Sequence, residues 1–424
     1  MKVFVNRPES RAAAGAARFP GWRIAWALAI TQTVGYGVLT YAFGVFTLPM
    51  ESELGWTRAQ TSGAFSLALL VSGLAAFPIG RWVDARGARG IMSIGSLLGA
   101  VLVLLWSFVT SLPALYLVQA GIGLVMSAVL YDVAFTVIAT WFRRDRIRAM
   151  LLVTMVAGLA STIFIPLATG LVEGFGWREA LRILALILAV LTIPLHALVL
   201  RDNPRRHGFE PDGRQRTTPD VSAAAADPEE RSVTARTALR SKVFWWLSSA
   251  FTLDSIANIG IVAHVVPLLI ERGYAPGVVA VAAGSIGLMQ VLGRVVFAPA
   301  TRRIPLGLLA VWTYSLRVVA LLVLLFLPGT AGLWLFAAVF GVANGASTLA
   351  RAGLVAETFG PAHFGAINGS ITTMVSLLHT VAPLSVGFIR ARTGSYEVAL
   401  WLLIGLAALA AFAAWRARVQ PVPG

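Results

Sequence analysis

Long apolar runs separated by short polar segments repeat along almost the whole chain. A helix that spans a bilayer needs about 20 mainly apolar residues, so each run bounded by charged residues, glycine or proline predicts one transmembrane helix. The predicted ranges are 22–49, 58–80, 91–110, 113–141, 148–172, 178–200, 243–270, 277–300, 305–327, 331–357, 363–389 and 395–415. A transmembrane barrel is excluded, because its strands are about 10 residues of alternating polarity. The pattern therefore predicts an all-α membrane protein with twelve transmembrane helices.

One long polar segment, residues 201–242, divides the predicted helices into two sets of six. Its Pro, Asp, Arg and Ala content is typical of a flexible linker, and its last part, 228–242, can form a short helix on the membrane surface. We therefore predict two six-helix bundles. The domains are an N-terminal tail (1–21), an N-terminal bundle (22–200), a linker (201–242), a C-terminal bundle (243–415) and a C-terminal tail (416–424).

Composition agrees with lipid as the solvent of this chain. Of 424 residues, 58% are hydrophobic and 12% charged, and the mean hydropathy is +0.79, which excludes an ordinary soluble domain. The net charge of +15 does not indicate nucleic-acid binding, because basic residues gather in alternate inter-helix segments, as Lys and Arg do when they stay in the cytoplasm. These are Arg81, Arg86, Arg89, Arg143, Arg144, Arg146, Arg148, Arg302 and Arg303. We predict a multi-pass protein of the plasma (cytoplasmic or inner) membrane with both termini in the cytoplasm, and expect a monomer.

Several function classes lack the residues they would need. The chain has no cysteine, so disulfides and thiolate metal sites are excluded. It shows no metal-spaced histidine cluster, no phosphate-binding glycine loop followed by lysine, no paired catalytic carboxylates and no sizeable soluble domain. We therefore predict neither an enzyme nor a receptor, no cofactor, and no ATP-driven transport by this chain alone.

A glycine-rich and arginine-rich motif, Gly80-Arg-Trp-Val-Asp84-Ala-Arg86-Gly87-Ala-Arg89, lies between the second and third predicted helices. Its glycines permit a tight turn, and Asp84 can pair with an arginine or cap a helix end, a contact that can break as two bundles rock. The alternative is an ordinary basic cytoplasmic loop. The spacing resembles the signature loop of the major facilitator superfamily, with Ala85 and Ala88 where basic residues are usual. The resemblance implies a gating loop at this motif.

Within that superfamily, the chain is similar to the bacterial monocarboxylate transporter and oxalate/formate antiporter branch. The stretches that carry the similarity are Gly21-Trp22-Arg23, Gly35-Tyr36-Gly37, Tyr41-Ala-Phe-Gly-Val-Phe46, Glu53-Leu-Gly-Trp56-Thr-Arg58, Trp141-Phe142-Arg143-Arg144, Gly176-Trp177-Arg178, His264-Val-Val-Pro267 and Glu357-Thr-Phe-Gly360. The resemblance implies a secondary transporter that carries a small organic anion by alternating access.

Five charged residues lie deep in predicted helices: Asp132, Asp254, Arg294, Arg317 and Arg351. An ionised side chain at the bilayer centre costs about 2.5–3.5 kcal/mol on insertion scales, so each is a functional candidate unless it is paired or reaches the interface. Asp254 can pair with Arg317. Arg351 is near Glu357 in sequence and can extend toward the interface.

Arg294 is the main substrate-binding candidate. The resemblance implies that an arginine of the eighth helix binds the carboxylate, after a polar or acidic residue one turn earlier, which is Gln290 here. The i, i+4 spacing puts both side chains on one helix face, where a guanidinium can hold a carboxylate through two hydrogen bonds. The alternative is an arginine that reaches the cytoplasmic interface. Relatives that handle dicarboxylates add a lysine in the eleventh helix, where this chain has Val375, so a monoanion is favoured.

The other candidates are Tyr36, Tyr131, Asp132 and His264. Tyr131 can bond the substrate, and burial of Asp132 makes it a candidate proton acceptor, although it can equally be a structural partner of Arg351. Tyr36 between two glycines indicates either an irregular first helix at the site or close packing through small residues. His264, next to Pro267, is a second proton-coupling candidate or a residue of a helix bend.

Inward movement of one negative charge against 100 mV costs about 2.3 kcal/mol, and proton symport removes that cost. We therefore expect a monocarboxylate to move with a proton, with exchange of anions as an open alternative. The other function that we consider is a proton-coupled exporter of drugs or other amphipathic solutes. Such relatives carry an arginine beside the glutamine of helix four, where Gln119 has none, and a Gly-Pro pair in helix five, where Gly158 and Pro166 are separated.

Overall fold

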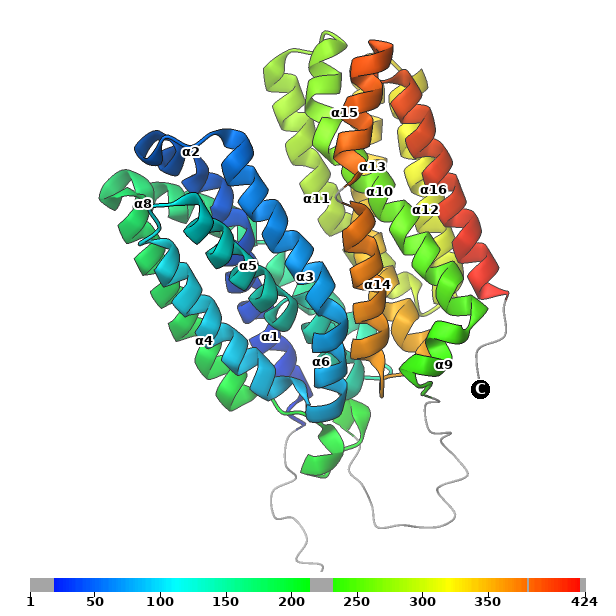
Figure 1. Ribbon diagram of the computed structural model, residues 1–424. Coiled ribbons are helices and arrows are strands. Elements are labelled where there is room, and N and C mark those ends of the chain that lie inside the picture. Colours follow the sequence, from blue (N-terminus) through cyan, green and yellow to red (C-terminus); the bar gives the residue numbers. More distant parts are fainter. Residues whose placement is uncertain (1–18, 214–231, 380, 420–424) are drawn as a thin grey trace, which may run out of the picture.

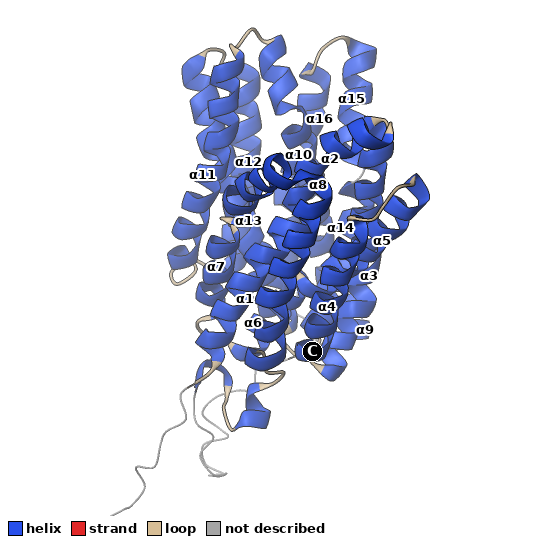
Figure 2. Ribbon diagram, turned by 90° about the vertical axis from the view of Figure 1, so that its left-hand side faces the viewer, coloured by secondary structure: helices blue, strands red, loops and turns tan. Residues whose placement is uncertain are grey.

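The computed structural model describes residues 19–213, 232–379 and 381–419. The helices are α1 (Gly21–Tyr36), η1 (Gly37–Tyr41), α2 (Ala42–Leu54), α3 (Arg58–Arg86), α4 (Ala88–Trp106), α5 (Leu112–Val129), α6 (Tyr131–Trp141), α7 (Arg146–Ala157), α8 (Ala160–Pro194), η2 (Leu195–Val199), η3 (Pro204–His207), η4 (Pro211–Gly213), α9 (Ala235–Arg240), α10 (Lys242–Glu271), α11 (Pro276–Ala300), α12 (Leu306–Phe326), α13 (Thr330–Phe359), α14 (Phe364–His379), α15 (Val381–Thr393) and α16 (Glu397–Arg418). The described part of the chain is helices and connecting loops (Figure 2).

Eleven continuous helical stretches of the described residues are long and apolar enough to cross a membrane. One of them, Arg146–Val199, contains Gly176, whose φ of 77° and ψ of 162° interrupt the helix. This stretch therefore makes two spans, the fifth and the sixth. The described residues thus contain twelve spans, as the sequence predicted.

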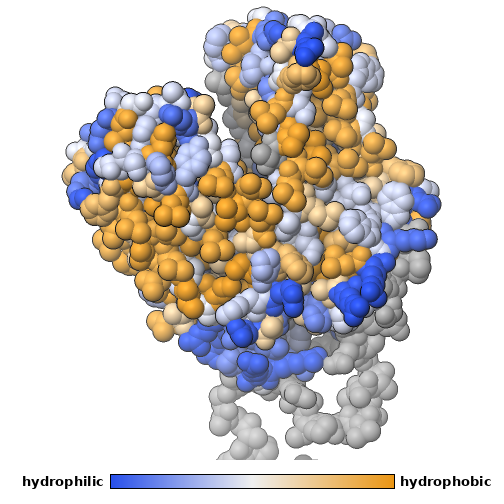
Figure 3. All heavy atoms as spheres, in the orientation of Figure 1, coloured by the Kyte–Doolittle hydropathy of each residue, from blue (hydrophilic) through white to orange (hydrophobic). Residues whose placement is uncertain are grey.

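The spans form two groups, one from α1 to α8 and the other from α10 to α16 (Figure 1). The groups meet near the end where the chain passes from one to the other, which we call the linker side, and diverge toward the opposite end, the far side (Figure 1). The space-filling view shows this division into two lobes, with apolar residues over much of the middle and hydrophilic residues gathered toward the linker side (Figure 3). Leu117, Leu198 and Leu384 are more than 70% exposed, which suits contact with lipid.

The distribution of buried apolar side chains explains the shape. One cluster contains residues of both bundles, such as Ile24 and Phe142 with Phe244 and Leu349. The other two clusters each belong to a single bundle, one around Trp106 of the first and the other within the second. Among the described residues, the bundles therefore share one of the three clusters, and burial of that shared apolar surface holds them together.

Both described ends of the predicted linker are folded, and its composition did not indicate this for the first end. The carboxylate of Asp212 accepts hydrogen bonds from the backbone N–H groups of Arg143, Arg144 and Asp145 at 3.1, 2.8 and 3.3 Å. The short surface helix expected near 228–242 is present as α9. Residues 214–231 lie outside the described residues, as do the tails 1–18 and 420–424.

Candidate transport site

Three membrane spans of the first bundle are irregular near the middle of their length. The first span has a π-helical turn, η1, directly after Tyr36. The fourth span is interrupted at Leu130, with φ −89° and ψ −163°, and α6 starts at the next residue, Tyr131. The fifth span is interrupted between α7 and α8, at Gly158 and Leu159. Irregular backbone is tolerated inside a membrane where it is buried in protein or lines a cavity.

The break in the fourth span is stabilised by the first span. The side chain of Gln32, fully buried, donates to the backbone oxygen of Val129 at 2.7 Å, the last residue of α5. A Cβ at Gly35 would lie 3.1 Å from Leu130, and a Cβ at Gly37 would lie 2.2 Å from Phe164. The two glycines around Tyr36 therefore allow close packing against the fourth and fifth spans, and the π-helical turn follows at the same place.

Tyr36 and Tyr131 are half-buried and in contact, with ring centroids 4.6 Å apart. Tyr131 also stacks on Phe135 at 5.0 Å. The break thus presents two phenol groups in contact with each other.

Arg294, on α11 of the second bundle, reaches across to the first bundle. Its Nη1 donates to the backbone oxygen of Thr154 on α7 at 2.9 Å, and a Cβ at Gly158 would lie 3.2 Å from that same nitrogen. Its Nε is buried and has no hydrogen-bond partner among the described residues. Gln290 lies one helical turn before it and is also half-buried. The side chain of Arg294 is therefore directed toward the fifth span rather than along its own helix toward the interface.

Asp132, the second residue of α6, is bonded to the eleventh span. Its Oδ1 accepts from Asn368 Nδ2 at 2.7 Å and from the Thr372 hydroxyl at 3.1 Å. Arg351 Nη2 donates to the same hydroxyl at 2.5 Å. Asp132 is thus linked to Arg351 through one threonine, across the boundary between the bundles. The sequence had suggested a partnership of Asp132 and Arg351, and the contact is indirect.

His264 lies away from this cluster. Its Nε2 is 2.9 Å from the backbone oxygen of Pro383, to which it donates, and its Nδ1 is 3.4 Å from the Tyr396 hydroxyl. These contacts join the seventh span to the eleventh and to the segment before the twelfth, all within the second bundle. Of the other five candidates, Tyr36, Tyr131 and Asp132 lie at the break in the fourth span, and Arg294 reaches the fifth span from α11, which also carries Gln290.

Asp254 and Arg317 form the buried ion pair that the sequence predicted. Arg317 Nε lies 2.5 Å from Asp254 Oδ1, and Nη2 lies 3.2 Å from Oδ2. Arg317 also donates to Asn258 at 2.8 Å, and its guanidinium is 5.1 Å from the Phe340 ring centroid. Because both charges are satisfied within the second bundle, we interpret the pair as structural.

We expect Arg317→Leu to destabilise the protein by about 3–5 kcal/mol, because Asp254 would remain buried without its partner. The double variant Asp254→Leu/Arg317→Leu should regain most of that stability, since it removes both charges. Thermal unfolding of the purified variants in detergent measures both effects. An unchanged melting temperature for Arg317→Leu would contradict a structural role.

The motif expected as a gating loop is mostly helical. Gly80, Asp84 and Arg86 lie in the last two turns of α3, which ends at Arg86 rather than near residue 80 as predicted. Only Gly87, with φ +84°, separates α3 from α4. The reason is that the polar residues of the motif continue the helix to the membrane surface, while the one positive φ requires glycine.

Asp84 caps a helix of the other bundle. Its two carboxylate oxygens accept from the backbone N–H groups of Gly365 and Ala366, at 2.9 and 2.7 Å, in the first turn of α14. A negative charge is favourable there because of the free N–H groups and the helix dipole. The helix-capping alternative, rather than pairing with an arginine, is therefore the one found.

The arginines of the motif make other contacts. Arg86 lies over the Trp82 ring, 4.3 Å from its centroid. Arg89 donates through its backbone N–H to Asp202 at 3.0 Å and through Nε to the backbone oxygen of Ala197 at 2.8 Å. Arg89 therefore fixes the turn between the second and third spans to the end of the sixth.

The two bundles approach most closely along α3 and α14. A Cβ at Gly80 would lie 2.0 Å from the Gly365 backbone oxygen, and a Cβ at Gly369 would lie 2.3 Å from the Ala76 backbone oxygen. Small residues let two membrane helices pack backbone to backbone. The linker side is closed by this contact together with the Asp84 cap.

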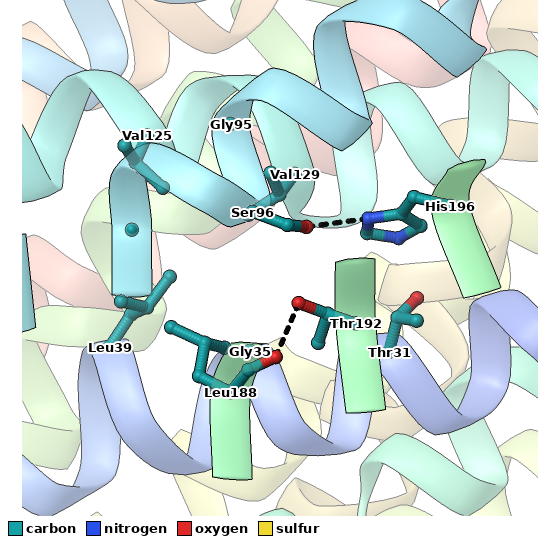
Figure 4. A pocket seen from close by; sticks show the side chains of 11 residues that line it. Thr31, Gly35, Leu39, Gly95, Ser96, Val125, Val129, Leu188, Thr192 and His196 are labelled. Atoms are coloured by element: carbon teal, nitrogen blue, oxygen red, sulfur yellow. Dashed lines mark hydrogen bonds between the residues drawn. The ribbon is translucent and has the colours of Figure 1, made fainter. Parts of the chain in front are cut away.

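A small buried cavity lies inside the first bundle, between the first, third, fourth and sixth spans (Figure 4). His196, in the π-helical turn η2, points into it, and its Nδ1 is 2.7 Å from the Ser96 hydroxyl. Its Nε2 is buried without a hydrogen-bond partner in the described residues. Sequence reasoning did not single out His196, because a lone histidine near a helix end carries no pattern.

The sequence and its fold match a known family. Residues 28–383 match the Major Facilitator Superfamily. The chain belongs to this superfamily. Its members are transporters rather than enzymes, and the chain is a multi-pass secondary transporter. The fold agrees: a solved structure of the E. coli fucose:proton symporter FucP aligns with a TM-score of 0.71 at 14% identity, over 95% of this chain and all of that one.

Relatives of known name extend the comparison. The chain is 27% identical to monocarboxylate transporter 13 of Bos taurus over 387 residues, 89% of this chain and 84% of that protein. It is 27% identical to the oxalate:formate antiporter of Oxalobacter formigenes over 248 residues, 57% of this chain and 54% of that one. An uncharacterised 38 kDa protein of Thermoproteus tenax is 26% identical over 389 residues, 90% of this chain and 93% of that one. The resemblance to the monocarboxylate and oxalate/formate branch is thus confirmed as a distant similarity.

Proposed function

We propose that this transporter moves a small organic monoanion, a monocarboxylate, together with a proton. The observation that carries the proposal is Arg294, a cation of one bundle that reaches the irregular fifth span of the other and retains a buried, unpartnered Nε among the described residues. A guanidinium in this position can bind a carboxylate between the bundles, with Tyr36 and Tyr131 as hydroxyl donors and Gln290 on the same helix face. The names of the relatives support a carboxylate.

Asp132 is the proposed proton carrier. It is the only carboxylate among the deep charged residues of the described fourth span, and its Oδ1 links the bundles through Asn368 and Thr372. Protonation of Asp132 removes a negative charge from the proposed site and so raises the affinity for an anion, and by linkage a bound anion raises the affinity for the proton. His264 is left with a positioning role for the eleventh span.

Alternating access follows from the contacts on the linker side. In the conformation described here, the Asp84 cap and the glycine packing of α3 against α14 close that side, while the bundles diverge on the far side. Opening the linker side requires these contacts to break and the Asp132 link to part. We place both termini and the linker in the cytoplasm of the plasma membrane, on the distribution of arginine.

Uptake into proteoliposomes tests the proposed function. We expect labelled lactate, pyruvate or benzoate to accumulate faster, by about tenfold, under an inward proton gradient than without one, since the gradient supplies about 1.4 kcal/mol per pH unit. A protonophore should abolish the stimulation, and protein-free liposomes correct for passive entry of the acids. Transport of none of the monoanions, combined with dye efflux, would contradict the proposal and favour the exporter of amphipathic solutes.

A further inference from the structure

We propose that Asp132 selects anions by valence, because its charge cancels that of Arg351 and leaves the site with the single uncompensated cation Arg294. The inference rests on the proposed function, in that it concerns the same site, and it names the residues that would make the site prefer one negative charge over two.

The geometry joins the two opposite charges through one hydroxyl group. Thr372 donates to Asp132 Oδ1 at 3.1 Å and accepts from Arg351 Nη2 at 2.5 Å. The hydroxyl therefore has its donor and acceptor functions both used, and it fixes the guanidinium beside the carboxylate. Asn368, 3% exposed and one turn before Thr372 on α14, donates a hydrogen bond to the same carboxylate oxygen. Asp132 is thus oriented toward Arg351 by two neutral side chains.

The remaining deep charges do not change this balance. Asp254 and Arg317 neutralise each other in a bidentate pair inside the second bundle. Arg294, in contrast, makes its described hydrogen bond to a backbone oxygen, which is neutral. Taken together, and called the cluster below, Arg294, Arg351 and ionised Asp132 therefore carry one net positive charge.

This balance gives a reason for a monovalent substrate. With an anion of one charge and a proton on Asp132, the loaded cluster has the same net charge as the empty cluster with Asp132 ionised. A divalent anion with one proton would leave the cluster without the positive charge and would move a net negative charge through the membrane, against its potential. The empty and the loaded transporter thus carry the same charge across the membrane only if both Asp132 and Arg351 are present.

Three variants remove the charges of Asp132 and Arg351 one at a time and together. Asp132→Asn keeps the acceptor oxygen for Thr372 and Asn368 but removes the negative charge, so the cluster should carry two positive charges. Arg351→Gln should leave it neutral, and the double variant Asp132→Asn/Arg351→Gln should restore one positive charge. The control is Glu179→Gln, which removes an exposed carboxylate paired with Arg182 in the first turns after Gly176, far in sequence from the cluster.

The experiment measures equilibrium binding of lactate and of malonate to the purified proteins at neutral pH by tryptophan fluorescence. We expect the ratio of malonate to lactate affinity to rise about tenfold or more in Asp132→Asn, the effect of one unit charge at short range in a protein interior. The ratio should return to the unmodified value in the double variant, and Glu179→Gln should leave it unchanged. Lactate binding should weaken in Arg351→Gln.

Because the experiment measures binding and not transport, its outcome tests this inference separately from the proposed function. If the unmodified protein accumulates none of the monoanions, proton-driven uptake fails, while the valence ratio in Asp132→Asn still decides the inference. An unchanged ratio in Asp132→Asn, a rise also in Glu179→Gln, or binding of neither anion by any variant would overturn it. The melting temperature of each variant confirms that the protein is folded.

Discussion

Arg294→Ala is expected to reduce monocarboxylate uptake by about 100-fold, at a wild-type level of folded protein. A bidentate guanidinium–carboxylate contact consists of two charge-assisted hydrogen bonds, each worth about 1.5–3 kcal/mol. At the low end the two together contribute about 3 kcal/mol, which corresponds to a change in affinity of roughly 100-fold. The measurement is gradient-driven uptake into proteoliposomes over a range of substrate concentrations. The effect should fall mainly on the apparent affinity.

Two further variants distinguish recognition of the anion from a structural role of Arg294. Arg294→Lys keeps the positive charge but offers a point charge instead of a planar fork, so it should retain part of the uptake. Arg303→Ala is the control. It removes an exposed arginine three residues after the end of α11 and should leave uptake unchanged. Because Arg294 also donates to Thr154, a loss of uptake together with a large drop in melting temperature for both Arg294 variants would contradict the assignment.

The fold could be predicted from the sequence because its controlling pattern is simple. Apolar runs of membrane length are imposed by the bilayer and are visible one helix at a time. The same pattern cannot show where a span is interrupted. The break at Leu130 lies in an apolar stretch without proline or glycine, and it depends on Gln32 of another span, which donates to Val129. Such a long-range contact has no local signal.

The candidate site was predictable only in part, for the same reason. An ionised residue in an apolar run is conspicuous, and this picked out Asp132, Arg294 and Arg351. Their neutral partners are ordinary in a membrane helix, so the roles of Thr372 and Asn368 became visible only when α14 was placed beside α6. The position of His264 was equally unreadable, because its contacts are to residues 119 and 132 positions further along the chain.

The helical end of α3 shows how a motif can be recognised correctly while its local structure is predicted wrongly. Glycine and arginine in sequence suggest a loop, yet Gly80 is helical, and its lack of a side chain serves the approach of α14. A tight helix crossing and a turn demand the same residue. The position of α14 in the second bundle shows that Gly80 serves the helix crossing.

Gly80→Ala is expected to prevent closure of the linker side and so to abolish most transport. A Cβ at this position would lie 2.0 Å from the Gly365 backbone oxygen and 2.9 Å from the Ala366 nitrogen, the group that Asp84 caps. Overpacking of this kind costs about 1–3 kcal/mol, which corresponds to a shift of about 5- to 150-fold away from the closed form. Because alternating access requires both forms, uptake should fall by about tenfold or more.

The chain has no cysteine, so a single introduced thiol reports the opening without background. Ile367→Cys places it at a fully buried position of α14 on the linker side, where a membrane-impermeant maleimide should react slowly in the parent and faster by about tenfold with Gly80→Ala. Gly90→Ala is the matched control, since a Cβ there meets nothing within 4 Å and alanine favours the helix. If Gly80→Ala transports normally and the thiol stays protected, the close packing of α3 against α14 does not limit the cycle, and the prediction is wrong.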